Sequence, residues 1–231
     1  MPRPRKKPNY NPEIVMKELV AEVVELYATS EKEVSIRQIA DEFDMTPLKI
    51  RKLLITAGVF SSDICDQVLE LSKSGKSVLE IQKITGLSRA SVHSYLPYSK
   101  IVYNAVDMSV NAERIRLYRG RKEAVHNFRK HMKESGGVTD ILVEELWKVI
   151  AVFEKYPFYT MKGFRFTYHV KGNEIFVSRK EKSITRSSVI LAMKKAIELQ
   201  NQVKGPKQLE TFGASYLYPI FVKIGLIESE R

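Results

Sequence analysis

The sequence predicts a mainly α fold, in which two tandem three-helix units precede a basic connector helix and a C-terminal α+β domain with a β-hairpin. Three patterns lead to this prediction. Apolar residues recur at helical spacing on both sides of a glycine in residues 77–96, residues 36–54 repeat that pattern, and residues 164–179 alternate with a period of two. The expected boundaries are 1–11 for a basic arm, 12–60 and 61–104 for the two units, 105–135 for the connector and 136–231 for the last domain.

The second unit contains the clearest pattern. Val78, Ile81 and Ile84 are spaced as one buried stripe of a helix. Gly86 follows where the chain must turn, because glycine adopts positive φ at little cost. Ser88 is typical of a residue that caps the N-terminus of a second helix. The inner face of that helix is expected to carry Val92, Tyr95 and Leu96, and Pro97 should end it.

The first unit repeats the pattern at a constant offset. Ile36, Ile39, Ile50 and Leu54 fall on Val78, Ile81, Val92 and Leu96, while Asp44, Met45 and Thr46 fall on Gly86, Leu87 and Ser88. Aspartate tolerates the left-handed conformation of a corner better than most residues. The preceding helices also match, with Leu19, Val20, Val23 and Leu26 on Ile64, Cys65, Val68 and Leu71. The match places Cys65 in the core as a small apolar residue.

These residues resemble the helix-turn-helix of DNA-binding proteins, as found in resolvases and invertases and in the last region of bacterial sigma factors. The resemblance rests on Ile81, Gly86, Leu87, Ser88, Val92 and Leu96. It implies that the second helix of each unit enters the major groove of DNA. With the apolar face inward, the side chains expected to contact DNA are Thr46, Pro47, Leu48, Lys49, Arg51, Lys52, Ser88, Arg89, Ala90, Ser91, His93 and Ser94. Neither outward set contains a carboxylate, and two linked units would suit adjacent half-sites.

Composition and charge favour the same partner. The chain has 231 residues, 44% of them hydrophobic, and a net charge of +11. A cationic surface attracts polyphosphate through counterion release, so double-stranded DNA is the first partner to consider. One cysteine excludes an intramolecular disulfide. No apolar run approaches the length of a transmembrane helix and no signal peptide is recognisable, so a cytoplasmic, nucleoid-associated location and no membrane partner are expected.

Two further basic segments are expected to help. Arg3 and Arg5 lie in a proline-rich arm suited to DNA phosphates or a narrow minor groove, or to a solvated tail. The arm is similar to an AT-hook but lacks its central glycine. The connector helix, which Gly120 should interrupt, offers Arg114, Arg116, Arg119 and Arg121 to the DNA backbone or to solvent.

The C-terminal domain should begin after Ser135-Gly136-Gly137. A helix beginning after Thr139 precedes a hairpin over 164–179, with its turn at Gly172-Asn173. In that register Phe164, Phe166, Tyr168 and Val170 share the packed face with Ile175 and Val177. Further helices follow from Thr185 and in residues 208–227. Self-association through this domain is one expected role.

No catalytic constellation is expected, so the chain is interpreted as a non-enzyme without cofactor or metal. His126 and Arg129, with Trp147 and Tyr156 downstream, are similar to the last box of tyrosine recombinases, but no room remains for that family's earlier elements. The histidines lack the spacing of zinc sites.

The favoured function is sequence-specific binding of duplex DNA as a transcriptional regulator that inserts two recognition helices. The alternatives are a non-catalytic recombination, replication-initiation or partition factor of a mobile element, and a protein-interaction adaptor.

Overall fold

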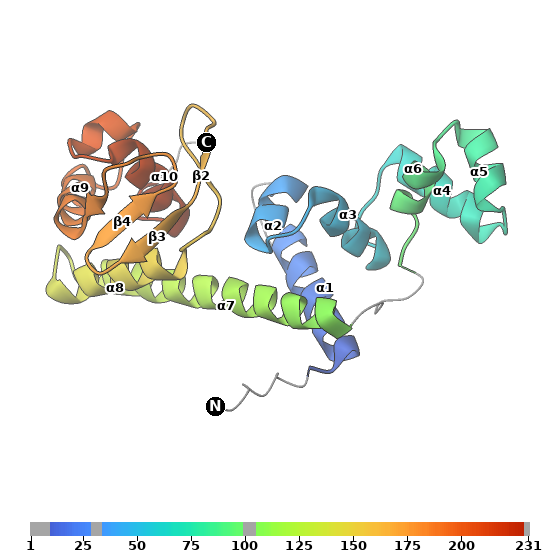
Figure 1. Cartoon of the computed structure of the whole chain (residues 1–231), viewed down its shortest axis with the longest axis horizontal. Helices are drawn as coiled ribbons and strands as arrows, with labels where there is room; N and C mark the ends of the chain where they lie inside the picture. The colour runs from blue at the N-terminus through green and yellow to red at the C-terminus, as the bar shows by residue number, and fades with distance from the viewer. Residues whose placement is uncertain (1–9, 29–33, 99–104, 229–231) are drawn as a thin grey trace. The chain divides into compact units, whose positions relative to one another are not determined.

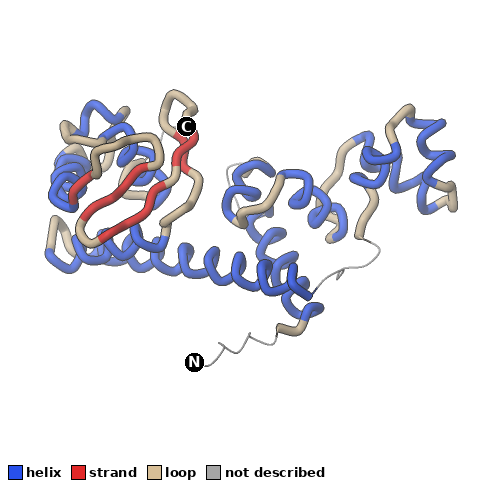
Figure 2. Tube along the Cα trace, in the orientation of Figure 1, coloured by secondary structure: helices blue, strands red, loops and turns tan. Residues whose placement is uncertain are grey.

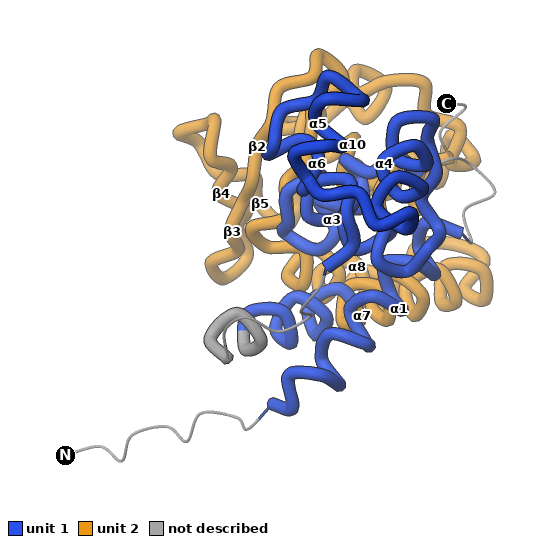
Figure 3. Tube along the Cα trace, turned by 90° about the vertical axis from the view of Figure 1, so that its right-hand side faces the viewer, with its two compact units in different colours: residues 1–118 blue, residues 119–231 orange. Residues whose placement is uncertain are grey.

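The structure is a computed structural model that describes residues 10–28, 34–98 and 105–228, the side chains of 105–109 excepted. It confirms a mainly α fold with a small C-terminal β region (Figures 1 and 2). The chain divides into two compact units, with the division between Tyr118 and Arg119 (Figure 3). Each unit is described by itself. In the described ranges, no helix is both long enough and apolar enough to cross a bilayer.

Unit 1 begins with a three-helix group whose helices are α1 (Pro12–Ala28), α2 (Ile36–Glu42) and α3 (Pro47–Thr56). Their inner side chains form one core around Leu19, Val23, Ile39, Ile50 and Leu54, all of which are fully buried. The beginning of α7 (Ala105–Glu134) completes this core with Ile115 and Tyr118.

A second three-helix group follows, made of α4 (Asp63–Lys73), α5 (Val78–Thr85) and α6 (Arg89–Tyr95). Its core is small, with Val68, Ile81 and Val92 as the fully buried members of the cluster. Cys65 is buried as expected. Two expected core positions are wrong: Ile84, assigned to the buried stripe, and Ile64, matched to Leu19, both lie exposed, because the short helices α4 and α5 have too few neighbours to cover a wide apolar face.

The backbone reproduces the repeat at its caps and corners. Ser35 and Ser77 form capping boxes with Gln38 and Glu80, one at the start of α2 and the other at the start of α5. The corners that follow are left-handed in both copies, with φ of 49° at Asp44 and 71° at Gly86. The left-handed corner expected at Asp44 and at Gly86 is therefore present in both copies.

Helix α7 is continuous from Ala105 to Glu134, so the expected interruption at Gly120 is wrong. Glycine costs a helix only about 1 kcal/mol relative to alanine, which the two cores flanking it outweigh. The division between units falls inside this helix, whereas we expected a connector over 105–135 and a boundary at 135–137. Residues 135–137 instead form the turn between α7 and α8 (Asp140–Val152), and both flanking segments belong to unit 2.

Unit 2 adds two small antiparallel sheets to its helices. β1 (Phe158–Tyr159) pairs with β2 (Arg165–Phe166). The second sheet has the order β3 (Tyr168–Lys171), β4 (Glu174–Val177) and β5 (Ile184–Thr185), and its first two strands are the hairpin predicted around Gly172-Asn173. Helix α9 (Arg186–Glu198), a short 3-10 helix η1 (Pro206–Leu209) and α10 (Ala214–Ile224) complete the unit.

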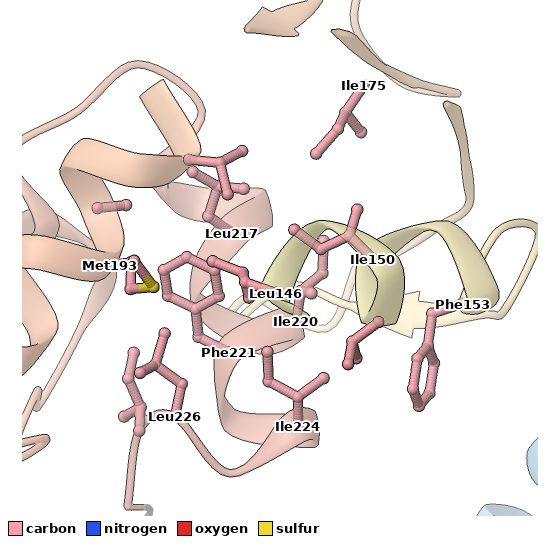
Figure 4. Close-up of a cluster of buried hydrophobic side chains, with 14 of the residues drawn as sticks. Leu146, Ile150, Phe153, Ile175, Met193, Leu217, Ile220, Phe221, Ile224 and Leu226 are labelled. Atoms are coloured by element: carbon pink, nitrogen blue, oxygen red, sulfur yellow. The ribbon is translucent and has the colours of Figure 1, made fainter. Parts of the chain in front are cut away.

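The core of unit 2 lies between these helices and the sheet. Leu217, Ile220 and Phe221 of α10 point toward side chains of α8 and α9, including Ile150 and Met193 (Figure 4). Phe166, Tyr168, Ile175 and Val177 supply the sheet side, as the period-two pattern predicted. Phe164 departs from that pattern, since 52% of its surface is exposed. It lies just before β2, and the Arg179 guanidinium is 5.0 Å from the centroid of its ring.

Candidate nucleic-acid interface

The two helices expected to contact DNA begin as the sequence predicts. Thr46 Oγ1 accepts a hydrogen bond from the Lys49 N–H at 3.4 Å, and Ser88 Oγ accepts one from the Ser91 N–H at 3.1 Å. Because these hydroxyls serve as N-caps, they fix where α3 and α6 start and which side chains follow on the outer face. Their oxygens are already partly used within the protein.

The first turns of both helices are open to solvent. Pro47, Leu48 and Lys49 are exposed on α3, with Leu48 at 54%. Arg89, Ala90 and His93 are exposed on α6. We call the set Leu48, Lys49, Arg89, Ala90 and His93 the reading surface. It combines cations, an imidazole and small or apolar groups, and none of its members is acidic.

The structure corrects the expected orientation of Arg51 and Lys52, which are not free on the outer face. The Arg51 guanidinium donates through Nη2 to Ser94 Oγ at 2.9 Å and lies 4.5 Å from the centroid of the Tyr95 ring. Lys52 Nζ donates to the His93 carbonyl at 2.8 Å and lies 4.8 Å from the Tyr98 ring. Both cations are half-buried and join α3 to α6.

Ser91 and Ser94 are also less accessible than expected. Ser94 Oγ donates to the Ser91 carbonyl at 2.7 Å while it accepts from Arg51. The Ser91 hydroxyl lies 2.9 Å from that of Ser88. These hydroxyls therefore stabilise the helix and the contact between the two groups.

A third hydrogen bond joins the end of α3 to the segment that follows α6. The Tyr98 N–H donates to Thr56 Oγ1 at 3.1 Å. Arg51 thus contacts Ser94 within α6, and Thr56 contacts Tyr98, which lies just beyond the end of α6. The exposed first turns of α3 and α6 together make up the candidate surface.

This contact argues against the expectation that the two units occupy adjacent half-sites. Half-sites one helical turn apart are separated by about 34 Å, whereas helices in side-chain contact lie on the order of 8–10 Å apart. The pair α3 and α6 can therefore address one stretch of duplex, but not two successive turns while the contact holds.

Arg51 also borders the core of the second three-helix group. Burial raises the pKa of the Cys65 thiol, nearby Asp66 raises it further, and the positive charge of Arg51 acts in the opposite sense. The thiol therefore stays protonated near neutral pH and packs as an apolar group. The Nε atom of Arg51 is buried and finds no hydrogen-bond acceptor among the described residues, which indicates that the guanidinium is held by packing as well as by Ser94.

The arginines of α7 differ in their surroundings. Arg114 donates to Asn111 Oδ1 at 3.1 Å and Arg116 pairs with Glu113 at 3.6 Å, while Arg119 is exposed. Arg121 is buried, with its guanidinium 5.9 Å and 5.2 Å from the rings of Phe153 and Tyr156. The expectation that Arg121 meets a DNA backbone is therefore wrong, because its charge lies over core rings. Arg3 and Arg5 lie outside the described residues.

The residues of the rejected recombinase box do not share a site. Arg129 Nε donates to the Ile224 carbonyl at 2.9 Å and so caps the end of α10, while Tyr156 is buried among rings and cations. His126 lies exposed on α7. Within the described ranges, no three His, Cys, Asp or Glu side chains are grouped so as to hold a metal ion.

Sequence reasoning missed the contact between α3 and α6. Helical periodicity describes each helix against its own core and says nothing of a neighbouring group. One signal was present: Tyr95 ends the second helix and Tyr98 follows it, and aromatic rings there are typical partners for arginine and lysine side chains.

No protein-family model, curated protein or solved structure gives a significant match to this chain.

Proposed function

We propose that the chain is a sequence-specific duplex-DNA-binding protein that acts as a transcriptional regulator. The observation that carries the proposal is the reading surface: two capped helices that contact each other expose cations and small groups without a carboxylate. The helix-turn-helix resemblance and the net charge of +11 support it.

The proposal assigns α6 to the major groove. The groove is about 12 Å wide, and a helix with its side chains is about 10–12 Å across, so one helix fits at a time. Arg89 suits a guanine edge and Ala90 a thymine methyl, whereas Lys49 on α3 is a point charge suited to a flanking phosphate. Arg51 and Lys52 position the two helices and do not read bases in this arrangement.

The test compares three exposed cations of unit 1 in the full chain. Oligonucleotides selected from a random pool would first define the preferred duplex. Arg89→Ala should then weaken binding to that duplex by about 1–3 kcal/mol and relax the preference at one position. Lys49→Ala should weaken binding to all duplexes alike and reduce the dependence of log K on log salt by about 1.

Lys17→Ala serves as the matched control, because Lys17 is exposed on α1 and belongs to neither second helix. It should leave affinity and preference unchanged. Equal behaviour of all three variants would contradict the assignment of the surface. A selection that yields no enriched duplex at low salt would contradict DNA binding itself, and salt-independent binding to a protein would favour the adaptor alternative.

A further inference from the structure

A second surface, in unit 2, combines exposed aromatic rings with cations. Phe164 and Phe212 are 52% and 45% exposed, and the Arg179 guanidinium and Lys180 ammonium lie 5.0 Å and 3.7 Å from their respective ring centroids. Because Arg179 and Lys180 are consecutive, the two rings flank one dipeptide. We call Phe164, Arg179, Lys180 and Phe212 the aromatic rim.

The rim is held by the fold and does not belong to a free loop end. The Phe164 N–H donates to Thr160 Oγ1 at 3.1 Å across the β1–β2 turn. The neighbouring Phe166 packs edge-on against Tyr216 of α10 at 5.0 Å between centroids, and Lys180 lies 6.0 Å from that same Tyr216 ring. The rings therefore project from a supported edge of unit 2, so they are presented to solvent with little freedom to fold inward.

Leaving two phenylalanines exposed has a cost. Burying a side chain of this size stabilises a protein by about 1.5–3 kcal/mol, and grouped apolar exposure is typical of binding surfaces, whereas scattered exposure is not. Phe164 could have been buried by the alternation that buries Phe166 and Tyr168. Its exposure beside a second exposed ring therefore suggests a partner that covers both.

The charge around the rings identifies the chemistry of that partner. Lys162 in the turn before β2 and Arg165 at the start of β2 are both exposed, and the segment after β4 adds exposed Lys182 and one acid, Glu181. Cores of protein interfaces are depleted in charge, whereas here each ring has a cation directly over one face. A partner with flat apolar faces on an anionic backbone satisfies both features.

We propose that the aromatic rim binds single-stranded nucleic acid. Bases stack on the ring faces that the cations leave open, and the guanidinium and ammonium groups meet the phosphates. A duplex fits less well, because its base faces are already stacked inside. The inference goes beyond the proposed function, since it concerns another unit and another form of nucleic acid, and it stands without the reading surface.

The ring test uses the full chain and a short fluorescent oligothymidylate followed by anisotropy. The double variant Phe164→Ala with Phe212→Ala should bind it about 10- to 100-fold more weakly, the range expected when base stacking is removed. The control is Leu191→Ala with Ile141→Ala. These side chains are apolar and 60% and 66% exposed in the same unit, but they have no ring on which a base could stack. The control should bind as the parent does, and the affinity of the ring variant for duplex should not change.

A second test changes only the cations, so it still tests single-strand binding by the aromatic rim if the ring variant fails to fold. Arg179→Gln with Lys180→Gln should lower the slope of log K against log salt by up to about 0.7 for each phosphate that the side chains no longer neutralise. Lys194→Gln, at an exposed lysine of α9, should leave the slope unchanged.

Three outcomes would overturn the proposal: no retention of the oligothymidylate at low salt, equal losses in the ring variant and its control, or competition by polyglutamate as effective as by the oligonucleotide. The last result would assign the surface to acidic protein segments. Lys49→Ala and Arg89→Ala should leave single-strand binding intact, so failure of the rim and failure of the reading surface are distinguishable.

Discussion

At the scale of single residues, the role of Arg51 in the structure differs from the role that the sequence repeat predicts. Its position in the repeat places it on the outer face of α3, and in the structure its guanidinium contacts Ser94 and the Tyr95 ring of α6. Charged hydrogen bonds contribute about 1.5–3 kcal/mol when partly buried. Arg51 therefore stabilises the contact that sets the reading surface.

Arg51→Ala should loosen this contact. The Tyr98 N–H donates to Thr56 Oγ1 across it, so the free energy that protects this amide from hydrogen exchange should fall by about 1–2 kcal/mol. Lys49→Ala, on the exposed side of the same helix, is the control and should leave the protection unchanged. Equal protection in both variants would show that Arg51 does not hold the two helices.

Two glycines give opposite expectations for the same substitution. Gly86 has φ of 71° and Gly120 lies within the continuous helix α7, and a Cβ on either would meet no atom within 4 Å. Gly86→Ala should therefore destabilise unit 1 by about 1–2 kcal/mol through backbone strain alone. Gly120→Ala should stabilise the chain by about 0.5–1 kcal/mol. Chemical denaturation measures both, and a loss of stability in both variants would contradict this account.

Residue-scale prediction succeeded where a local rule suffices. Thr46 and Ser88 cap their helices, and Asp44 adopts the left-handed corner, because each depends on its own backbone and a near neighbour. It failed for Arg121 and Phe164, whose surroundings come from segments distant in sequence. Amphipathic spacing cannot show which end of a helix or strand extends past its core.

At the scale of elements, the two capping boxes differ in one atom type. Ser35 and Ser77 both cap their helices, but the reciprocal side chain is Gln38 in the first copy and Glu80 in the second. The Glu80 carboxylate accepts from the Ser77 N–H and hydroxyl, each at 2.8 Å, and these bonds lower its pKa, with Lys76 and Lys83 adding to the effect.

The capping box of α5 should therefore weaken in acid, whereas that of α2, which contains no carboxylate, should not. Because the pKa of Glu80 is lower in the folded state, its contribution is complete above the unfolded-state pKa and is lost as pH falls through the folded-state pKa. Amide protection of α5 measured from neutral to acid pH should show this loss, and Glu80→Gln should abolish it. A pH dependence of α5 that persists in that variant would contradict the assignment.

Elements were predictable when they were long or carried clear signals. The helices and the hairpin at Gly172-Asn173 follow from caps, spacing and turn chemistry. Strands β1 and β5 each contain two residues, which is too short for any periodicity. Pro219 lies inside α10 without ending it, because Leu217, Ile220 and Phe221 on either side are fully buried and hold the helix.

At the scale of the molecule, the cores differ greatly in size. The cluster of the second three-helix group has Val68, Ile81 and Val92 as its fully buried members, whereas the cluster of unit 2 draws on α7, α8, α9, α10 and both sheets. Each buried aliphatic side chain stabilises by about 1.5–3 kcal/mol. Stability should therefore be distributed unevenly along the chain.

Hydrogen exchange followed by mass spectrometry should reveal this order. Segments of α5 and α6 should exchange first, those of the first three-helix group next, and those of α8 and α10 last. Uniform protection along the chain would contradict the prediction. The sequence favours such an order only indirectly, because the number of elements that cover each core is a tertiary property.

The molecule-scale boundaries were the least predictable feature. Ser135-Gly136-Gly137 has the composition of a linker, yet the change from one unit to the other falls near Gly120, within a helix. A run of serine and glycine predicts a turn in the chain. It does not predict a boundary between units, because a unit is defined by the side chains that share one core. Ile115 belongs to one core and Phe128 to another, although both are in α7.

This shared helix limits how the protein can be divided. A fragment ending before Ala105 gives up Ile115 and Tyr118, and one beginning after Glu134 gives up Phe128 together with the Arg129 side chain that closes the end of α10. Truncation at either end of α7 therefore gives a fragment that lacks part of its buried core. Exchange of these units with other proteins, by an engineer or by recombination, would therefore preserve both only if the junction kept a single unbroken helix.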